Sequence, residues 1–339
     1  MNLNMIWFFL VGLLLVGYAV LDGFDLGVGI LYPLAKTEEE RNALLEAIGP
    51  VWNGNEVWLV AGGGALFAAF PNVYATLFSG FYLAFILMLV ALIFRAVALE
   101  FRNKETWGWW RKLWDIVFVL GSAGSTFLFG VMVGNIILGL PIQANMDFQS
   151  AMFLNLFHPY AILVGLFILS LFALHGAMYL HLKTQTLLQE RVKQWTRFWY
   201  SAFIGLYLLT TGALFVKQFS IIRHVQAHWW TWGIVIFLII AILSIPFCLR
   251  QKKEVTALLA SGGVITVTFF LFGMGLYPTL LPSRLDSTWN LTIYNAAASE
   301  KTLFIMLIVA AIGLPFVLAY TFGVYWVFRG KVYTEDKLL

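Results

Sequence analysis

The sequence predicts an all-α integral membrane protein, and three features of its composition support that prediction. Of the 339 residues, 61% are hydrophobic and only 11% are charged, whereas soluble domains carry about 25% charged residues. Apolar runs of roughly 20 residues or more, the length that crosses a bilayer as a helix, recur along the chain. Aromatic residues make up 17%, including 14 Trp, as expected where aromatic rings anchor helix ends at the membrane interfaces.

Nine apolar segments follow one another, separated by short polar stretches. They cover residues 6–31, 52–70, 73–99, 114–140, 154–181, 198–218, 229–249, 257–281 and 302–328. The segment 52–70 is the weakest, because it is short, rich in glycine and polar at its start. Pro71 predicts a break after it, since proline removes a backbone hydrogen bond from a helix. No soluble domain stands out, so residues 1–339 are expected to form a single polytopic membrane domain.

The distribution of Lys and Arg predicts the orientation of the chain. With the N-terminus outside, sixteen of the 21 Lys and Arg residues fall in cytoplasmic loops and the tail, and Arg95 lies within a helix. The other four face outward: Lys217, Arg223, Arg284 and Lys301. This bias follows the positive-inside rule. We expect a multi-pass protein of a bacterial or archaeal cytoplasmic membrane with a cytoplasmic C-terminus. The basic residues lie in short blocks between apolar runs, so they do not indicate nucleic-acid binding.

The stretch from Gly17 to Gly29 reads GYAVLDGFDLGVG and places Asp22 and Asp25 inside the first apolar segment. Two carboxylates three residues apart lie on one face of a helix. An ionised aspartate near the middle of a span costs about 2.5–3.5 kcal/mol on insertion scales, so we expect this face to line a polar, protein-covered interior. Two interpretations remain open. The pair handles protons or another cation, or it belongs to a structural polar network between helices.

A second polar cluster lies at the start of segment 52–70, in the sequence GPVWNGNEVW from Gly49 to Trp58. Asn53 and Glu56 are three residues apart, which places them on one helical face. Glu56 lies just inside a span, where an acid is costly and usually functional, and it is a candidate proton carrier on a path from the cytoplasm. The alternative is that Glu56 and the neighbouring Asn side chains cap the helix and accept hydrogen bonds from its first backbone N–H groups.

The sequence offers few residues that could hold a metal or a haem. His175 is the only histidine deep inside an apolar segment, and a lone buried histidine is more often a hydrogen-bonded core residue than a ligand. Cys248 is the only cysteine, which excludes an internal disulfide and a cysteine-based metal site. We therefore expect no catalytic residue and no metal site in this chain, with His175 as a weak candidate for cofactor binding.

Taken together, the two polar clusters resemble subunit II of the cytochrome bd quinol oxidases. The resemblance rests on GYAVLDGFDLGVG, on GPVWNGNEVWL and on GGALFAAFP, which ends at Pro71. Shorter similarities follow at residues 78–82, 114–115 and 277–278, so the resemblance covers essentially the whole chain.

This resemblance implies a fold built largely of two four-helix bundles. It also implies a complex that couples quinol oxidation to the reduction of dioxygen to water in aerobic respiration. The partner would be subunit I, which in this family carries two haem b and one haem d. Subunit II would scaffold subunit I and contribute a proton path from the cytoplasm. A bound quinone or lipid and a small single-helix subunit are also compatible with the family.

Asn53 departs from the pattern of many relatives. They carry Asp at this position, and that acid is implicated in the proton path of the family. An Asn side chain cannot ionise, so this role does not carry over to Asn53. Glu56, which occupies a position that is Gln or Glu in relatives, is the candidate to supply the acid instead.

A stand-alone secondary transporter that uses the Asp pair for proton or cation coupling is the alternative from a different class. Such transporters usually show internal repeats and paired broken helices, and neither is clear in this sequence. A haem-binding subunit is a third interpretation, and it rests on His175 alone.

Overall fold

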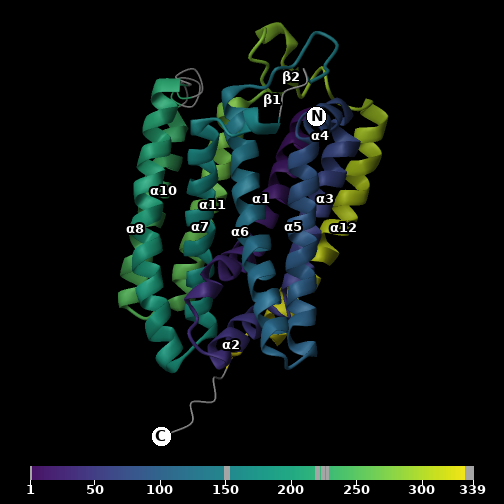
Figure 1. Cartoon of the computed structure of the whole chain (residues 1–339). Coiled ribbons are helices and arrows are strands. Elements are labelled where there is room, and N and C mark those ends of the chain that lie inside the picture. The colour runs from purple at the N-terminus through teal and green to yellow at the C-terminus, as the bar shows by residue number, and fades with distance from the viewer. Residues whose placement is uncertain (1, 149–152, 218–221, 223–225, 227–228, 333–339) are drawn as a thin grey trace, which may run out of the picture.

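The computed structural model describes residues 2–148, 153–217, 222, 226 and 229–332. Most of this part of the chain is helical (Figure 1). The α-helices are α1 (Leu3–Leu31), α2 (Glu38–Ile48), α3 (Trp52–Ala69), α4 (Pro71–Gly80), α5 (Tyr82–Phe101), α6 (Gly108–Leu138), α7 (Pro159–Lys183), α8 (Thr186–Lys217), α10 (Trp229–Arg250), α11 (Glu254–Leu276) and α12 (Glu300–Val327). Short 3₁₀ turns lie at Tyr32–Leu34, Arg102–Lys104, Phe153–Leu156 and Ser287–Trp289. Two strands, β1 (Thr279–Leu281) and β2 (Leu291–Thr292), form an antiparallel pair.

Eight of the described helices are long and apolar enough to cross a membrane, and the bent pair of α3 and α4 brings the number to nine. The predicted all-α membrane fold with about nine spans is therefore confirmed. Arg223 and Lys337, which enter the predicted charge bias, lie outside the described residues.

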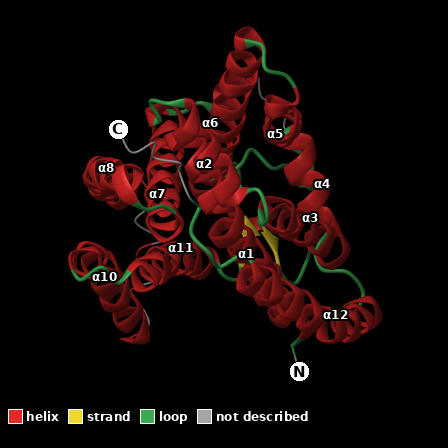
Figure 2. Ribbon diagram, turned by 90° about the horizontal axis from the view of Figure 1, so that it is seen from below, coloured by secondary structure: helices red, strands yellow, loops and turns green. Residues whose placement is uncertain are grey.

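The spans form two groups that meet along α1, α6 and α7 (Figures 1 and 2). In one group α1 packs against α3 and α6, and α5 packs against α6. In the other, α7 packs against α8 and α11, and α10 packs against α11. In the most apolar window of each helix, 78% of the residues of α7 are buried but only 6% of those of α8 and of α12. Helix α7 is thus central, whereas α8 and α12 lie at the periphery.

Glycines bring the central helices together. A Cβ placed on Gly27 of α1 would lie 2.0 Å from the carbonyl oxygen of Phe172 in α7, and one on Gly176 would lie 2.5 Å from the carbonyl carbon of Gly27. Because both obstacles are backbone atoms, the crossing of α1 and α7 requires glycine. Small residues at helix contacts are the usual way in which membrane helices approach closely.

The third apolar segment is not one helix, which corrects the prediction for 73–99. Pro71 begins α4 as expected, and α3 and α4 meet at an angle of 119°. A second interruption follows at Phe81, and α5 begins only at Tyr82. Ser79 and Gly80 directly precede the second break, but the apolar residues on both sides of them made the stretch read as one span.

The two ends of the helix bundle carry different structures (Figure 1). Strands β1 and β2 lie at the end where α1 begins, and α2 lies at the other. The buried guanidinium of Arg102 holds α2 in place by donating hydrogen bonds to Asp115, Asn42 and Glu38. Burial raises the pKa of Glu38, but the hydrogen bond from Arg102 and the charges of nearby arginines outweigh it and hold the pKa below its ordinary value.

Candidate functional site

Helix α1 carries both predicted aspartates into the protein interior. The side chains of Asp22 and Asp25 are fully buried, as expected for two carboxylates that cannot face lipid. Asp25 lies six residues before the end of α1 at Leu31, which is about 9 Å along the helix axis. The pair therefore lies inside the bundle, nearer to the end that carries α2.

Asp22 forms an ion pair with Arg95 of α5. The Nη1 and Nη2 atoms of Arg95 donate to Oδ2 and Oδ1 of Asp22 at 2.9 and 2.6 Å. Both side chains are completely buried. This parallel, two-bond geometry is the strong form of an arginine–carboxylate interaction. It balances the charge of Asp22 and joins α1 to α5.

Glu56 approaches the same arginine from α3. Its Oε1 atom lies 3.5 Å from Nη2 of Arg95, and its side chain is 25% exposed. Among the described residues no hydrogen bond joins Glu56 to a backbone N–H at the start of α3, and its Oε1 atom has no hydrogen-bond partner. The capping interpretation of Glu56 therefore finds no support in the geometry, whereas its position beside a buried guanidinium is clear.

Asn55 connects Asp25 to the last helix. Its Nδ2 atom donates to Oδ2 of Asp25 at 2.7 Å, and its Oδ1 atom accepts from the hydroxyl of Tyr325 in α12 at 2.9 Å. Asn53, the other predicted member of this segment, is exposed on α3. The interior position thus belongs to Asn55. We call Asp22, Asp25, Asn55, Glu56 and Arg95 the charge cluster.

Four atoms in and next to the charge cluster are buried without a hydrogen-bond partner among the described residues: Oδ1 of Asp25, Oε1 of Glu56, Nε of Arg95 and the hydroxyl of Tyr18. Tyr18 precedes Asp22 by one helical turn. Buried polar atoms in native proteins are normally hydrogen-bonded to protein or to water. The cluster therefore retains free hydrogen-bonding capacity.

Sequence reasoning missed Arg95, Asn55 and Tyr325 as members of this site. Arg95 gave a signal, because a lone cation inside an apolar segment needs a buried anion, but the sequence did not say which of the acids in apolar segments was its partner. Asn55 could not be distinguished from Asn53, because both lie between Trp52 and Trp58 and the sequence does not show which of them faces the interior. Tyr325 gave no sequence signal, because its contact with Asn55 spans most of the chain.

His175 lies in the interior of α7 with both ring nitrogens engaged. Nε2 lies 2.9 Å from the carbonyl oxygen of Val20, and Nδ1 lies 2.7 Å from the hydroxyl of Ser261. Because a carbonyl oxygen only accepts, Nε2 carries the proton and Nδ1 accepts from Ser261. The described residues contain no group of three or more His, Cys, Asp and Glu side chains arranged to hold a metal ion.

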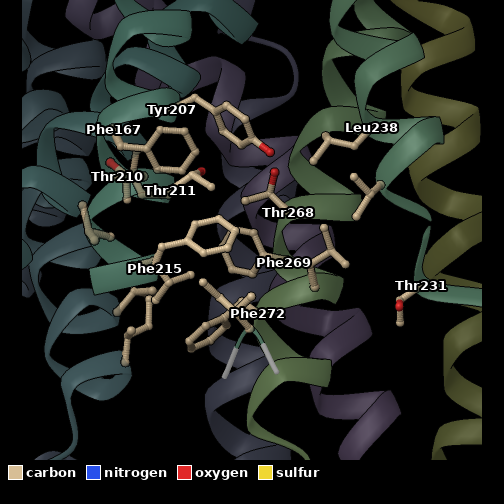
Figure 3. A pocket seen from close by; sticks show the side chains of 18 of the residues that line it. Phe167, Tyr207, Thr210, Thr211, Phe215, Thr231, Leu238, Thr268, Phe269 and Phe272 are labelled. Atoms are coloured by element: carbon tan, nitrogen blue, oxygen red, sulfur yellow. The ribbon is translucent and has the colours of Figure 1, made fainter. Parts of the chain in front are cut away.

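A separate cavity of about 350 Å³ lies between helices of the second group and α6 (Figure 3). Aromatic rings line it, among them Phe167, Phe269 and Phe272. Three hydroxyls of its lining are buried without a partner among the described residues: those of Tyr160, Thr210 and Thr268.

Comparison with known proteins assigns the chain to a family. The sequence profile of cytochrome bd terminal oxidase subunit II matches residues 3–328. The cytochrome bd ubiquinol oxidase subunit 2 of Bacillus subtilis is 35% identical over 340 residues, and the match covers 99% of each chain. The cytochrome bd-I ubiquinol oxidase subunit 2 of Escherichia coli is 32% identical, with 98% of this chain and 96% of the relative covered. The chain belongs to the cytochrome bd terminal oxidase subunit II family.

The fold agrees with this assignment. A chain in the structure of bd oxidase from Geobacillus thermodenitrificans superimposes with a TM-score of 0.80 at 19% identity, covering 97% of this chain and 99% of that one. A bd oxidase subunit II is part of an oxidoreductase complex, so the transporter interpretation gives way to the family assignment.

The residues of this subunit offer no position for a haem ligand at His175. An axial histidine needs a free ring nitrogen, and both nitrogens of His175 are already hydrogen-bonded within the protein. His175 therefore does not fit the role of a haem ligand in this bd oxidase subunit.

Proposed function

We propose that this chain serves a quinol-oxidising, dioxygen-reducing complex in two ways: it scaffolds the haem-bearing subunit I, and it carries protons through its charge cluster. The observation that supports the proton role is the arrangement around Arg95. One buried guanidinium bonds to Asp22 and lies 3.5 Å from Glu56, and the same cluster holds the buried carboxyl group of Asp25. If all three were ionised, two negative charges would remain uncompensated in a low-dielectric interior, which is costly.

The geometry supports different roles for the three carboxyl groups. Asp22 is fixed by two hydrogen bonds to Arg95, so we assign it to holding the guanidinium in place. Asp25 keeps one oxygen free of partners while Asn55 holds the other. Oε1 of Glu56 is buried beside Arg95 without a hydrogen bond, while the side chain as a whole is 25% exposed, so we assign Glu56 to proton exchange between the cluster and its surroundings.

Reduction of dioxygen to water consumes protons, and the position of Glu56 suits their delivery. It is the fifth residue of α3, on the end of the bundle that carries α2 and that the Lys and Arg bias assigns to the cytoplasm. A proton that enters there has to cross only a short part of the membrane before it reaches the cluster. Asn53 cannot carry it, because an amide does not ionise.

The haem groups of the complex, two haem b and one haem d by family resemblance, are assigned to subunit I. His175, the one deep histidine, is engaged on both nitrogens and leaves no axial position. The aromatic cavity offers a different kind of site. Its apolar walls and unpartnered hydroxyls suit a quinone or a lipid, whose carbonyl oxygens accept hydrogen bonds.

Substitution of Glu56 by Gln tests the proton role. Gln keeps the shape and hydrogen bonding of Glu but cannot release a proton at neutral pH, so quinol-driven oxygen consumption by the purified complex should fall about tenfold or more. Haem content and recovery of the complex should not change. Glu100→Gln, which removes an exposed acid at the end of α5, is the matched control and should retain the full rate. Asn53→Asp in the Glu56→Gln background should restore part of the lost turnover.

An unchanged rate in Glu56→Gln, with the complex intact, would show that protons enter elsewhere. A rate that fell equally in Glu100→Gln would point to a general effect of surface charge and would remove the special role of Glu56.

A further inference from the structure

After α12 the chain continues as a short segment, residues 328–332, which we call the strap. It lies at the end of the bundle that carries α2 (Figure 1). The Nζ atom of Lys183, the last residue of α7, donates to the carbonyl oxygens of Phe328 and, at 3.3 Å, of Gly330. The backbone N–H of Val332 donates in turn to the carbonyl oxygen of Lys183 at 2.8 Å. The strap therefore joins the end of α12 to the second helix group.

Lys331 fixes the strap at a second point. Its Nζ atom lies 2.9 Å from Oε2 of Glu254 at the start of α11, and it donates to the carbonyl oxygen of Thr184 at 3.3 Å. Gln189 of α8 donates to the other oxygen of Glu254 at 2.6 Å. Lys183 itself is only 7% exposed, and a buried ammonium requires acceptors such as the carbonyl oxygens of the strap.

Along the membrane, α12 is weakly covered. It packs against α1 and α3, and only 6% of its most apolar window is buried. Pro315 lies inside the helix and removes one of its backbone hydrogen bonds, so contacts of the first half do not fix the second half rigidly. The position of the second half therefore depends on contacts close to its own end.

Tyr325, one turn before the strap, is the residue through which α12 reaches the charge cluster. Its ring lies edge-on to Phe24, with the ring centroids 6.3 Å apart, and its hydroxyl donates to Oδ1 of Asn55 at 2.9 Å. Nδ2 of Asn55 donates to Oδ2 of Asp25 at 2.7 Å and to the carbonyl oxygen of Leu21 at 3.2 Å. Because a carbonyl oxygen only accepts, these contacts define the orientation of the amide, and Tyr325 holds it from the other side.

We propose that Lys183 is a positioning residue for the charge cluster. It holds the strap, the strap holds the end of α12, and Tyr325 on that end keeps the amide of Asn55 turned toward Asp25. Without the strap, Tyr325 moves away, the amide is free to rotate, and Asp25 loses its donor. The inference rests on the proposed proton role of the charge cluster, and it connects the second helix group to that role.

Lys183→Met tests the inference, because it removes the ammonium but keeps the length of the side chain. Oxygen consumption per amount of purified complex should fall about two- to tenfold, which corresponds to one net hydrogen bond. Lys183→Arg, which still donates to the strap, should retain most of the rate. Lys193→Met is the matched control on α8. The Lys193 side chain is 41% exposed and pairs with Glu190, so its loss should leave the rate unchanged.

Tyr325→Phe supplies a double-variant test. It keeps the ring beside Phe24 and removes only the hydroxyl, so the rate should fall by a similar factor. If Lys183 acts through Tyr325, Lys183→Met should reduce the rate no further in the Tyr325→Phe background. Losses that multiply would overturn the proposal. So would a Lys183→Met variant with less complex but a normal rate per complex, because that result describes a merely structural residue.

Trypsin cleavage after Lys331 in the purified complex reports whether the strap is in place, because an engaged Lys331 side chain is withheld from the protease. Cleavage, followed by the mass of the shortened chain, should be faster in Lys183→Met than in wild type and unchanged in Tyr325→Phe. Equal cleavage of Lys183→Met and wild type would show that Lys183 does not hold the strap, and the proposal would fail.

Glu56→Gln, measured beside these variants, separates the inference from the proposed function. A full rate in Glu56→Gln would refute the proton role and this inference with it. A slow Glu56→Gln beside a Lys183→Met that turns over as fast as Lys193→Met would refute the positioning role alone. If Lys183→Met does not assemble, Lys331→Met replaces it in the double-variant test, where it should give a smaller loss that again disappears in the Tyr325→Phe background.

Discussion

Asp22 and Arg95 are both fully buried and share two hydrogen bonds. Removal of one partner of such a buried pair costs about 3–5 kcal/mol, whereas replacement of both by apolar residues is often neutral. Without Asp22, Arg95 keeps Glu56 at 3.5 Å but loses both of its short hydrogen bonds to a carboxylate. We expect Asp22→Leu alone to reduce the thermal stability and recovery of the complex strongly. The double variant Asp22→Leu/Arg95→Met should recover much of that loss. Thermal unfolding of the purified complexes measures the stability of the single and the double variants. If the loss in the double variant equalled the sum of the losses in the two single variants, Asp22 and Arg95 would not be coupled.

His175 provides a test at the same scale for the assignment of haem to the partner. Its ring nitrogens bond to Val20 and Ser261, so His175→Ala removes packing and hydrogen bonds from the meeting point of α1, α7 and α11. The assembled oxidase should be less stable but should show every haem band in its reduced spectrum, normalised to the amount of complex. A haem band that disappeared while assembly persisted would refute the assignment.

The sequence predicted part of the charge cluster and left out the rest for physical reasons. Asp22, Asp25 and Glu56 are carboxyl groups in apolar segments, and the cost of such groups identifies them without a structure. Their partners depend on which helices meet, and the linear sequence does not contain that information. Asn55 rather than Asn53 faces inward because of the rotation of α3 about its axis, which packing against α1 determines.

At the scale of the helices, the sequence predicted spans more reliably than their interruptions. Apolar composition over about 20 residues is sufficient for a span, and Pro71 marked one break correctly. The interruption at Phe81 follows Gly80, the last residue of α4, but a single glycine in an apolar segment is a much weaker break signal than proline. The close contact of α1 with α7 also could not be predicted, because the chain holds 29 glycines and few of them lie at such crossings.

Gly27 and Gly63 make a matched pair for the role of glycine in these helices. A methyl group on Gly27 would collide with the backbone of α7, whereas one on Gly63 of α3 would meet nothing within 4 Å. Gly27→Ala should therefore destabilise the protein by about 1–3 kcal/mol. Gly63→Ala should leave the stability equal or raise it by up to about 1 kcal/mol. Midpoints of thermal unfolding in detergent compare the two, and equal midpoints would show that α1 and α7 have room to separate.

At the scale of the whole molecule, the two helix groups followed from family resemblance rather than from composition. Hydropathy counts spans but does not say which of them pack together. The pairing seen here places α1 and α7 in the centre through their glycines and leaves α8 and α12 outside. This arrangement also determines which loops lie at the same end of the bundle. The orientation predicted from the Lys and Arg residues can therefore be tested with one residue at each end.

The orientation of the molecule is the prediction that belongs to this scale. The turn after α10 and the turn between β1 and β2 lie at opposite ends of the bundle, and the Lys and Arg bias assigns the first to the cytoplasm. Gln251 and Ser287 are exposed in these two turns, and the native Cys248 is buried. In a Cys248→Ala background, a membrane-impermeant maleimide added to intact spheroplasts should label Ser287→Cys. It should reach Gln251→Cys only after the membrane is permeabilised. The reverse pattern would invert the molecule and move the Glu56 end of the charge cluster to the outer face, where proton uptake from the cytoplasm would need another route.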